Sequence, residues 1–463
     1  MTRAWVALLC TGLAACAGDA LPTGTSAQGP AATPHDFEPA TLSRDDRDEV
    51  VQIDSAPVCR VGGTNQYVLP SIDVDAEGRA LVAWRHCDGT KMLVAASSFD
   101  GARWTSVRLG GGPDGRVRVS LGTGGRGLAV WHNAVSSRDP GGAAYYHVFD
   151  VHGGWSARHL FAPGLDALSY QFHRFGGLFP FAGRSLVWSN FNAPGSHLQA
   201  SHVLDETRWT TERTVHLGEE SSSAALMGDA QGNVTAVWIR DAFGRKGRPA
   251  LWSARFDAHD GWSSARAFHT VAGSHASTLG TGMNAAGEGY AAWEKRSDDG
   301  SYTLEVARYS RRVGWRPPIA VEPVGRGFSV PWVRAVDVDP GGTAHVVWRN
   351  VGTSTLWTVR LVDGGPVGPP ERLGEGDQTR LATRADGAAL ALWSDIASDR
   401  VLFISRFYPG RGWDPAETVP LIAGEVDDDE TSGVALDERG HAFVLWVEAN
   451  GDRRDLWVRR FRL

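Results

Sequence analysis

HVVWRN, from His345 to Asn350, is an apolar run that ends in a tryptophan and two polar residues. Seven similar segments keep the tryptophan but differ in the residues after it: LVAWRH, LAVWHN, SLVWSN, TAVWIRD, YAAWEK, LALWSD and FVLWVE. The eight anchor tryptophans lie 45 to 57 residues apart; they are Trp84, Trp131, Trp188, Trp238, Trp293, Trp348, Trp393 and Trp446. A repeat of this kind indicates a fold built from one supersecondary unit used many times.

Each unit shows the same order of strand-like segments. A short alternating segment such as SIDVD (71–75) leads into a turn rich in Asp, Asn and Gly, which supply the positive-φ positions of a hairpin. The anchor segment follows, then a third segment such as LWSARF (251–256). A glycine-rich turn then introduces a tryptophan and a fourth segment, as in GWSSARAF (261–268). Four strands per unit without a helical period are typical of β-propeller blades.

We therefore predict an all-β protein, a β-propeller of eight four-stranded blades. A seven-bladed ring is the alternative if the unit around Trp188, the least regular one, is accommodated differently. The last unit stops after its third segment at Leu463, while EVVQIDS (49–55) precedes the first unit without a partner. We expect this strand to complete the last blade, so that the closed ring has no long exposed edge.

The N-terminal segment has the pattern of an export signal: a basic start at Arg3, an apolar run too short to span a bilayer, then small residues. Its end, Leu13-Ala14-Ala15-Cys16, resembles the bacterial lipobox. The resemblance implies cleavage before Cys16 and lipid on that cysteine, and Ala17 in place of Asp points to the outer membrane. The alternative is an ordinary secretory signal with a chance cysteine.

The predicted organisation is a signal peptide over 1–15, a lipid-anchored flexible tether over 16–47 and a propeller over 48–463. The tether is assigned from its Ala, Gly, Pro, Ser and Thr content. The localisation is the cell envelope, facing either the periplasm or the surface. Of the four cysteines, Cys10 belongs to the signal and Cys16 carries lipid, so Cys59 and Cys87 are expected to form a disulfide.

Charge and composition exclude some functions. A net charge of −7 gives no basic footprint for nucleic acid. No His-x-x-x-His or Cys-x-x-Cys pair occurs, so we expect no transition metal and no cofactor. The acidic stretch EVDDDET, Glu425 to Thr431, is interpreted as a solvated loop, with calcium binding as the alternative.

The residues that come after the anchor tryptophans are expected to leave the packed zone and form a polar ring around one mouth of the propeller. The candidate ligand-binding residues in this ring are Arg85, His86, His132, Asn133, Asn190, Arg240, Asp241, Glu294, Lys295, Arg349, Asn350, Asp395 and Glu448. Loops between blades add Tyr67, Tyr170 and Trp332. Aromatic faces beside Arg, Asn and Asp suit sugar binding; the alternative is that the rings fill the core.

The turns before the fourth strands, SSFDGARW, VFDVHGGW, RFDAHDGW and YPGRGW, resemble degenerate Asp-box (BNR) repeats of the sialidase-like propeller superfamily. The strict motif spacing is not met, so the resemblance implies blade architecture over about 59–463 and says little about catalysis. Five third strands carry an arginine at one position, which we assign to ion pairs or packing between blades: Arg255, Arg308, Arg360, Arg406 and Arg460.

The leading hypothesis is a monomeric outer-membrane lipoprotein, anchored to the membrane through its lipid only, whose propeller binds a glycan or an envelope protein without catalysis. The alternative is a polysaccharide-degrading enzyme, a sialidase-type glycoside hydrolase or a lyase. Four acids of the predicted ring could supply a carboxylate pair: Asp241, Glu294, Asp395 and Glu448. A structural scaffold is the third hypothesis, favoured if the Tyr170 loop plugs the mouth.

Overall fold

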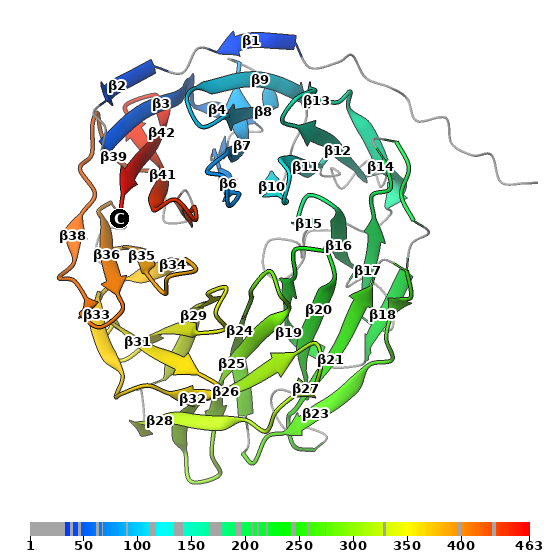
Figure 1. Cartoon of the computed structure of the whole chain (residues 1–463), viewed down its shortest axis with the longest axis vertical. Coiled ribbons are helices and arrows are strands. Elements are labelled where there is room, and N and C mark those ends of the chain that lie inside the picture. The colour runs from blue at the N-terminus through cyan, green and yellow to red at the C-terminus, as the bar shows by residue number, and fades with distance from the viewer. Residues whose placement is uncertain are drawn as a thin grey trace, which may run out of the picture.

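The structure is a computed structural model. It describes residues 33–37, 40–44, 48–61, 64–66, 68–88, 91–111, 117–133, 142–165, 178–190, 196–205, 207–210, 213–218, 221–241, 247–257, 259–273, 275–326, 330–395, 400–427 and 432–463. Over these residues the chain forms eight antiparallel sheets arranged as blades around one axis (Figure 1). The predicted eight-bladed propeller is confirmed. Within the same ranges there is no helix with the length and apolar character needed to cross a membrane.

Each blade begins with a first strand next to the axis and adds strands outward. The first strands are β6 (Ser71–Val74), β10 (Arg118–Leu121), β15 (Leu178–Phe181), β19 (Ser221–Gly228), β24 (His275–Met283), β29 (Pro331–Val338), β34 (Asp377–Thr383) and β40 (Gly433–Leu436). The second strands are β7 (Ala80–Cys87), β11 (Arg126–Asn133), β16 (Ser185–Asn190), β20 (Val234–Arg240), β25 (Glu288–Arg296), β30 (Ala344–Asn350), β35 (Ala389–Ser394) and β41 (His441–Asn450).

The outer half of each blade follows the same order. The third strands are β8 (Met92–Phe99), β12 (Gly142–Asp150), β17 (Ser196–His202), β21 (Ala250–Asp257), β26 (Ser301–Ser310), β31 (Thr355–Val362), β36 (Leu402–Tyr408) and β42 (Arg453–Arg462). The fourth strands are β9 (Trp104–Gly111), β14 (His159–Leu165), β18 (Arg213–Gly218), β23 (Arg266–Thr270), β28 (Ile319–Arg326), β33 (Glu371–Glu375), β38 (Glu417–Thr418) and β3 (Asp48–Pro57).

Shorter elements complete the sheets. Two-residue strands pair with the ends of third strands at β13 (Gly154–Trp155), β22 (Gly261–Trp262), β27 (Gly314–Trp315), β32 (Gly365–Pro366) and β37 (Gly412–Trp413). β39 (Glu425–Val426) pairs with β41, and β4 (Cys59–Val61) forms a hairpin with β5 (Thr64–Gln66). β1 (Thr33–Phe37) lies on β9, and β2 (Ala40–Arg44) lies on β3. The predicted tether is therefore paired with the ring along parts of 33–44.

The tryptophan-bearing second strands are the most buried part of each blade. All residues of β7 and β35 are buried, because blades cover both faces of the strand. This is why these segments read as continuous apolar runs, whereas a strand with one solvated face would alternate. In the described residues seven anchor tryptophans are at most 1% exposed: Trp84, Trp131, Trp238, Trp293, Trp348, Trp393 and Trp446.

Several anchor tryptophans also bond to the preceding blade. The indole nitrogen of Trp238 donates to the carbonyl of Leu217 in β18 at 2.9 Å, and that of Trp393 donates to the carbonyl of Glu375 in β33 at 3.1 Å. Trp84 donates to the Asp54 carboxylate in β3 at 2.6 Å. A buried indole usually finds an acceptor. The fourth strand of the preceding blade supplies it, so one side chain both packs and hydrogen-bonds two blades together.

The polar turns between first and second strands are capped by their own carboxylates. Asp75 Oδ1 accepts a hydrogen bond from the amide of Arg79, and Asp437 Oδ1 accepts from the amides of Arg439 and His441. Asp229 and Asp339 make the same contact with the amide four residues later. Asx-type bonding satisfies the tight turn and explains why the sequence repeats Asp or Asn there.

The ring closes as predicted, with β3 completing the last blade beside β42. Asp54 of β3 also lies 2.7 Å from Nδ1 of His86 in β7, so the closing strand is bonded to the first blade as well. A disulfide joins Cys59 to Cys87, with 5.4 Å between their Cα atoms, and confirms the predicted pairing. These contacts hold the first and last blades together.

Four of the five repeated third-strand arginines contact the following blade, and Arg255 pairs within its own strand. The guanidinium groups of Arg360, Arg406 and Arg460 sit 5.5, 5.1 and 5.3 Å from ring centres in the following blade, those of Phe407, Phe461 and Phe99. Arg308 instead pairs with Glu288 and Asp363, and Arg255 with Asp257. Their assignment to ion pairs and packing is confirmed.

We predict that Gly376→Ala destabilises the fold by about 3 kcal/mol. Gly376 follows β33 at φ 153°, and a Cβ there would lie 2.5 Å from Cδ1 of Trp393 and 2.3 Å from the Ser394 carbonyl oxygen. Overpacking and an unfavourable backbone conformation both cost stability. The check is the free energy of unfolding in urea.

The matched control is Gly365→Ala, because the nearest atom to its added Cβ would be the Val362 carbonyl oxygen at 3.8 Å. This variant should stay within about 0.5 kcal/mol of the wild type. Equal stability of the two variants would show that the tryptophan interface tolerates extra volume.

Candidate functional site at the axial mouth

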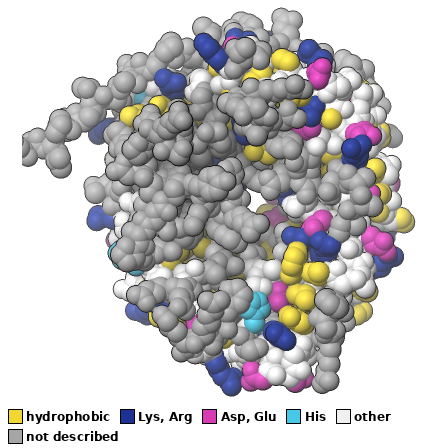
Figure 2. Space-filling view, turned by 180° about the vertical axis from the view of Figure 1, so that it is seen from behind, with side chains coloured by type: hydrophobic (Ala, Val, Ile, Leu, Met, Phe, Trp, Pro, Cys, Tyr) yellow, Lys and Arg dark blue, Asp and Glu magenta, His cyan; other side chains and the backbone are white. Residues whose placement is uncertain are grey.

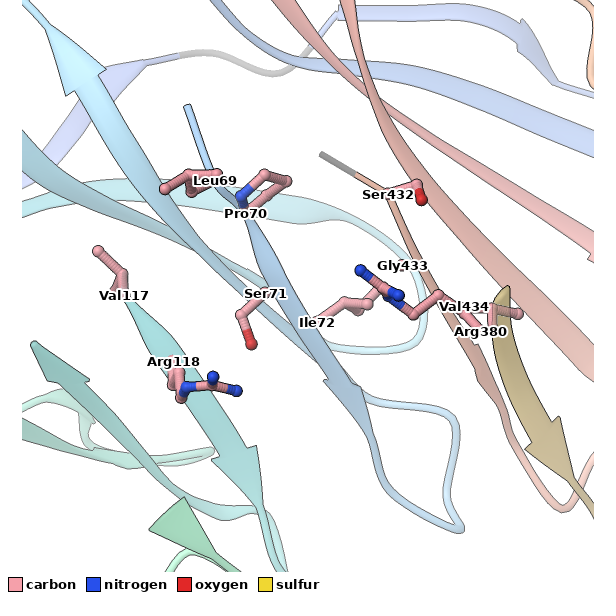
Figure 3. Close-up of a pocket in the computed structure, with 10 residues that line it drawn as sticks. All are labelled: Leu69, Pro70, Ser71, Ile72, Val117, Arg118, Arg380, Ser432, Gly433 and Val434. Carbon is pink, nitrogen blue, oxygen red and sulfur yellow. The ribbon is translucent and has the colours of Figure 1, made fainter. Parts of the chain in front are cut away.

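The mouth is defined as the end of the ring where first strands begin and second strands finish. A cavity of about 190 Å³ lies there, lined by the starts of β6, β10 and β40, by the residues just before them, and by Arg380 in the middle of β34. Figure 3 shows Arg118 of β10 and Arg380 of β34 reaching into this space from opposite sides. We call this cavity the axial pocket.

Contacts within the fold position the polar side chains that line the axial pocket. Ser71 accepts a hydrogen bond at its Oγ from the amide of Val119 at 3.3 Å, which joins β6 to β10. Arg118 lies 4.6 Å from the ring centre of Phe179, and Arg380 Nη1 lies 3.4 Å from the carbonyl oxygens of Gln378 and Thr379. These contacts orient the two guanidinium groups at the mouth.

A second cluster lies at the mouth where β29 and β34 meet. Asp377 accepts from Arg334 Nη2, with oxygens at 2.5 and 2.7 Å, and from Arg349 Nη1 at 2.5 Å. The guanidinium of Arg334 lies 5.3 Å from the ring centre of Trp332, whose side chain is 37% exposed. The result is an accessible aromatic face held beside two arginines that share one carboxylate. We call these four residues the tryptophan cluster.

The backbone is irregular where the first strands begin. Leu69, Thr278 and Gln378 have φ values of 45°, 46° and 46°, which L residues other than glycine rarely adopt. The register shifts beside Thr278, between Ser277 and Gly280, and beside Gln378, between Asp377 and Arg380. Such bulges redirect side chains and are common next to binding sites. Leu69 itself lines the axial pocket.

Seen from behind the view of Figure 1, the described side chains form a mixed surface. Figure 2 shows basic, acidic and apolar groups interspersed over the described part of this face, with no extended block of one charge.

Four residues of the predicted polar ring are buried. Arg85 and His86 are 5% exposed, Glu294 is 2% and Glu448 is 0%. The expectation that they line an open mouth is wrong, because the packed zone extends one or two residues beyond the tryptophan. Glu448 shows the reason, since its carboxylate accepts from the amides of residues 422–424 at 2.7 to 3.1 Å and so holds the chain entering the last blade.

Other predicted ring residues take part in contacts within the fold. Arg240 stacks 3.7 Å from the centre of the Trp252 ring, and Lys295 Nζ donates to Glu305 at 2.7 Å. Asn350 accepts at Oδ1 from the amide of Gly352. Asp241 and Asp395 are half-buried. Only Arg349 and Trp332, among the predicted residues whose side chains the structure describes, join the tryptophan cluster.

Several predicted residues are not placed in detail. Tyr67, Tyr170 and Cys16 lie outside the described residues. His132, Asn133 and Asn190 end their second strands, as expected, but their side chains are not among those described. Their roles stay predictions.

The sequence reasoning missed the residues of the first strands. Arg118, Arg334, Asp377 and Arg380 lie at or near the starts of β10, β29 and β34. A usable signal is present, because these positions lie in the alternating segment of each unit, which forms the strand nearest the axis. Arg118 and Arg380 share one position of the repeat, opposite the residue before the anchor tryptophan, but the other units carry different residues there, so the tryptophan pattern does not single them out.

The four acids considered for catalysis do not form an exposed pair. Asp241 neighbours Glu294 on adjacent blades, and Asp395 neighbours Glu448, but each glutamate is buried and hydrogen-bonded. Burial raises the pKa of Glu294, while Ser277 donates to its Oε2 at 2.8 Å. Glycoside hydrolysis by a pair of carboxylates requires both carboxyl groups to reach the same glycosidic bond. The described positions of these four acids do not provide such a pair.

Metal binding has little support in the described part of the chain. No three His, Cys, Asp or Glu side chains gather there as a ligand set. In the acidic stretch, Glu425 pairs with Arg400 and Asp427 with Arg454, while residues 428–431 lie outside the described ranges.

Comparison with known proteins gives fold-level similarity. No family model matches the chain, and no curated protein matches it. Among solved structures it is similar to the polysaccharide lyase Uly1, with a TM-score of 0.47 and 10% identity over 76% of this chain and 90% of the lyase.

Two further solved structures are similar. The Hadza microbial sialidase Hz136 matches with a TM-score of 0.41 and 13% identity over 94% of this chain and 93% of the sialidase. A lectin of Aleuria aurantia in complex with α-methyl-L-fucoside matches with a TM-score of 0.37 and 12% identity over 78% and 98%. Values this low assign no function to this chain.

Two half-buried carboxylates join first strands of neighbouring blades. Asp73 Oδ2 accepts from the amide of Leu121 at 2.8 Å, and Asp337 Oδ2 accepts from the amide and hydroxyl of Thr383 at 2.7 and 3.0 Å. Burial raises the pKa of both carboxyls to about 6, because the hydrogen bonds offset only part of the desolvation. The ionised forms therefore oppose folding.

We predict that the free energy of unfolding falls as pH rises from about 4 to about 6, by roughly 2–3 kcal/mol for each of Asp73 and Asp337. In that window the folded state holds protons that the unfolded state has released, so raising the pH favours unfolding. Asp73→Asn and Asp337→Asn should each flatten the profile, measured by urea unfolding at about pH 4.5 and about pH 7.

Asp150→Asn is the control. Backbone amides of His152 and Gly153 lower the pKa of Asp150, so it is ionised in both states across most of this window. Its removal should leave the profile unchanged. An unchanged profile in the Asp73 and Asp337 variants would mean that water reaches both carboxylates.

Proposed function

We propose that the chain is an outer-membrane lipoprotein whose propeller binds a glycan across its mouth without catalysis. The observation that carries the proposal is the tryptophan cluster at the mouth. Trp332 offers an accessible aromatic face, and two arginines and a carboxylate next to it can bond hydroxyl groups. Aromatic surface combined with a few fixed polar groups is the usual chemistry of small-ligand sites.

The charged groups of this cluster are fixed before a ligand arrives. Side chains of Arg334, Arg349 and Asp377 are 20, 12 and 15% exposed, and Arg349 Nη2 also donates to Ser354 at 3.1 Å. Groups that are already ordered lose little entropy on binding. This supports a binding surface that is largely formed in the free protein.

One observation favours an enzyme as the second candidate. Glu294 at the mouth has a raised pKa, which is a property of general acids. Against this role, its side chain is 2% exposed and engaged by Ser277, so a substrate would have to displace part of β24 to reach it. Binding is the simpler function for this geometry.

Trp332→Ala should abolish most glycan retention, by about tenfold or more, because aromatic stacking contributes on the order of 1–2 kcal/mol or above at a binding centre. The measurement is an array of bacterial and plant polysaccharides, scored in the same wells for retained protein and for released reducing or unsaturated sugar. Val313→Ala, with 64% exposure in the turn before β27, is the control and should bind as the wild type does.

The array separates the candidates. Retention without product supports a binding module. Product that disappears in Glu294→Gln would make the chain an enzyme. Wells with neither signal would exclude the glycan proposal and favour a protein partner or a scaffold role.

The lipoprotein assignment has its own test. Cys16→Ser should prevent incorporation of labelled fatty acid in a bacterial host and release the protein from the membrane fraction, because the sulfur atom is the lipidation site that the lipobox resemblance implies. Cys10→Ser is the matched control and should be labelled normally. Labelling that survives Cys16→Ser would contradict the anchor.

A further inference from the structure

The far face of the ring, opposite the mouth, carries a repeated carboxylate at the turns that follow the third strands. Asp150 and Asp257 end the third strands of the second and fourth blades, each opposite the glycine of a two-residue strand. Oδ1 of each carboxylate accepts a hydrogen bond from an amide two residues later, at 2.9 and 3.0 Å. A carboxylate in this position caps its turn and leaves the turn acidic.

The fifth, sixth and seventh blades have no acid at the equivalent position. The pairing register places Ser310, Val362 and Tyr408 there. In the fifth blade the turn keeps its cap without the charge, because the hydroxyl oxygen of Ser310 accepts a hydrogen bond from the amide of Val313 at 3.2 Å. Three neighbouring blades therefore present an uncharged side chain at this position of the far face.

The inner turn of the fifth blade, between β24 and β25, is capped by an amide in place of a carboxylate. Asn284 Oδ1 accepts a hydrogen bond from the amide of Glu288 at 3.0 Å. Asp229 and Asp339 make this contact in the adjacent blades, and both are buried. The side chain of Glu288 pairs with Arg308 at 3.1 Å. Both far-face turns of the fifth blade are thus capped without a carboxylate.

Three exposed arginines follow the uncharged cap of the fifth blade, and they are Arg311, Arg312 and Arg316. Within the residues that the structure describes, their side chains make no ion pair or hydrogen bond. Arginines of corresponding turns elsewhere are paired, since Arg103 and Arg411 each lie beside an aspartate three residues away, at 3.6 and 2.6 Å. The fifth blade therefore projects cations whose donors are available to a ligand.

Exposed valines accompany these arginines. Val313 is 64% exposed in the fifth blade, and Val362 and Val367 are 41 and 43% exposed in the next turn around the ring. The two turns are joined, because Arg308 Nη1 donates to Asp363 at 2.8 Å, and their blades lie side by side (Figure 1). We call this exposed group the basic rim, which consists of Arg311, Arg312, Val313, Arg316, Val362 and Val367.

The basic rim matches the chemistry of an anionic membrane surface. Guanidinium groups bind phosphate oxygens with two N–H donors, and each basic residue close to an anionic leaflet strengthens attachment. Apolar side chains next to these cations can enter the boundary between lipid headgroups and acyl chains. Because the rim is formed by exposed turns on two adjacent blades, a flat and deformable surface can contact its basic and apolar components at once.

We propose that the basic rim docks the propeller on a bilayer that contains anionic phospholipid. The proposed lipid anchor at Cys16 places such a bilayer within reach, and the inference rests on that part of the proposed function. Tethering raises the effective concentration for a weak second contact. Docking through the far face leaves the mouth and Trp332 directed away from the membrane, where a glycan can approach them.

The first experiment reports the environment of Val313 in the full, lipid-anchored chain held in nanodiscs. Val313→Cys supplies a thiol for an environment-sensitive fluorophore, since Cys59 and Cys87 form a disulfide. Its emission should shift to shorter wavelength in discs that contain phosphatidylglycerol and not in discs of phosphatidylcholine alone. Leu204→Cys is the matched control, because Leu204 is 54% exposed in the corresponding turn of the third blade, and its label should not shift in either disc.

Arg311→Gln and Arg312→Gln should each lower the ratio of docked to undocked chain in phosphatidylglycerol discs about fivefold, and added salt should lower it further. Arg103→Gln is the control, because it removes the same charge from a turn arginine that is 81% exposed but paired with Asp100. It should leave docking unchanged. All three variants should retain glycan as the wild type does, because they lie opposite the mouth. Thermal unfolding of each variant shows whether it is folded.

The outcomes separate the proposals. Equal emission from the label at position 313 in the two kinds of disc would overturn docking and leave the anchor and the glycan function intact. The same shift in phosphatidylcholine discs on addition of soluble polyglutamate would show recognition of an acidic polymer and overturn the lipid assignment. Absence of fatty acid on Cys16 would overturn the anchor; the labelled chain is then mixed with phosphatidylglycerol vesicles, and no shift there would overturn the basic rim as well.

Discussion

Burial of an anchor tryptophan between blades, seen for seven anchors among the described side chains, is the interaction on which the rest of this structure depends. Strands within a blade bond to one another, so the blades themselves are held together mainly by side chains. At Trp238 and Trp393 the indole also donates to a carbonyl in the fourth strand of the preceding blade. A glycine at the end of that strand, such as Gly376, leaves room for the ring. Spacing, strand order and glycine placement are therefore parts of one packing requirement.

Because each anchor tryptophan must be enclosed, the residues that can differ between blades lie closer to the axis than the ends of the second strands. Residues one or two places after the tryptophan are still enclosed by the neighbouring blade, as Arg85, Glu294 and Glu448 show. The first strands begin closer to the axis, where a bulge at Gln378 breaks the register. A bulge releases side chains from the pleat. The mouth can therefore differ between blades there without disturbing the tryptophan interface.

Most of the fold could be predicted from the sequence because the fold is repetitive. Eight tryptophans, Asx turns such as that of Asp75 and an unpartnered strand at the N-terminal end of the ring predicted blade number, strand order and closure, and each depends on local chemistry. The candidate site was harder to predict. Arg349 and Trp332 were found because they lie beside the repeat, whereas Arg118 and Arg380 come to line one pocket only through ring geometry. Contacts between distant blades leave no periodic trace in the sequence.

Net charge says little about the mouth, because acidic and basic residues occur at both ends of the blades, as Arg79 beside Asp75 and Arg349 beside Asp377 show. Many carboxylates cap turns opposite the mouth, where Asp437 and Asp150 accept backbone amide hydrogens. Such an acid counts toward a charge of −7 yet offers its oxygens to the chain itself. At the mouth, Asp377 is bound by two arginines, and Arg118 and Arg380 line the pocket. The polar groups presented at the mouth therefore depend on which side chains the backbone and the ion pairs of the fold already engage, and the net charge of the chain does not report them.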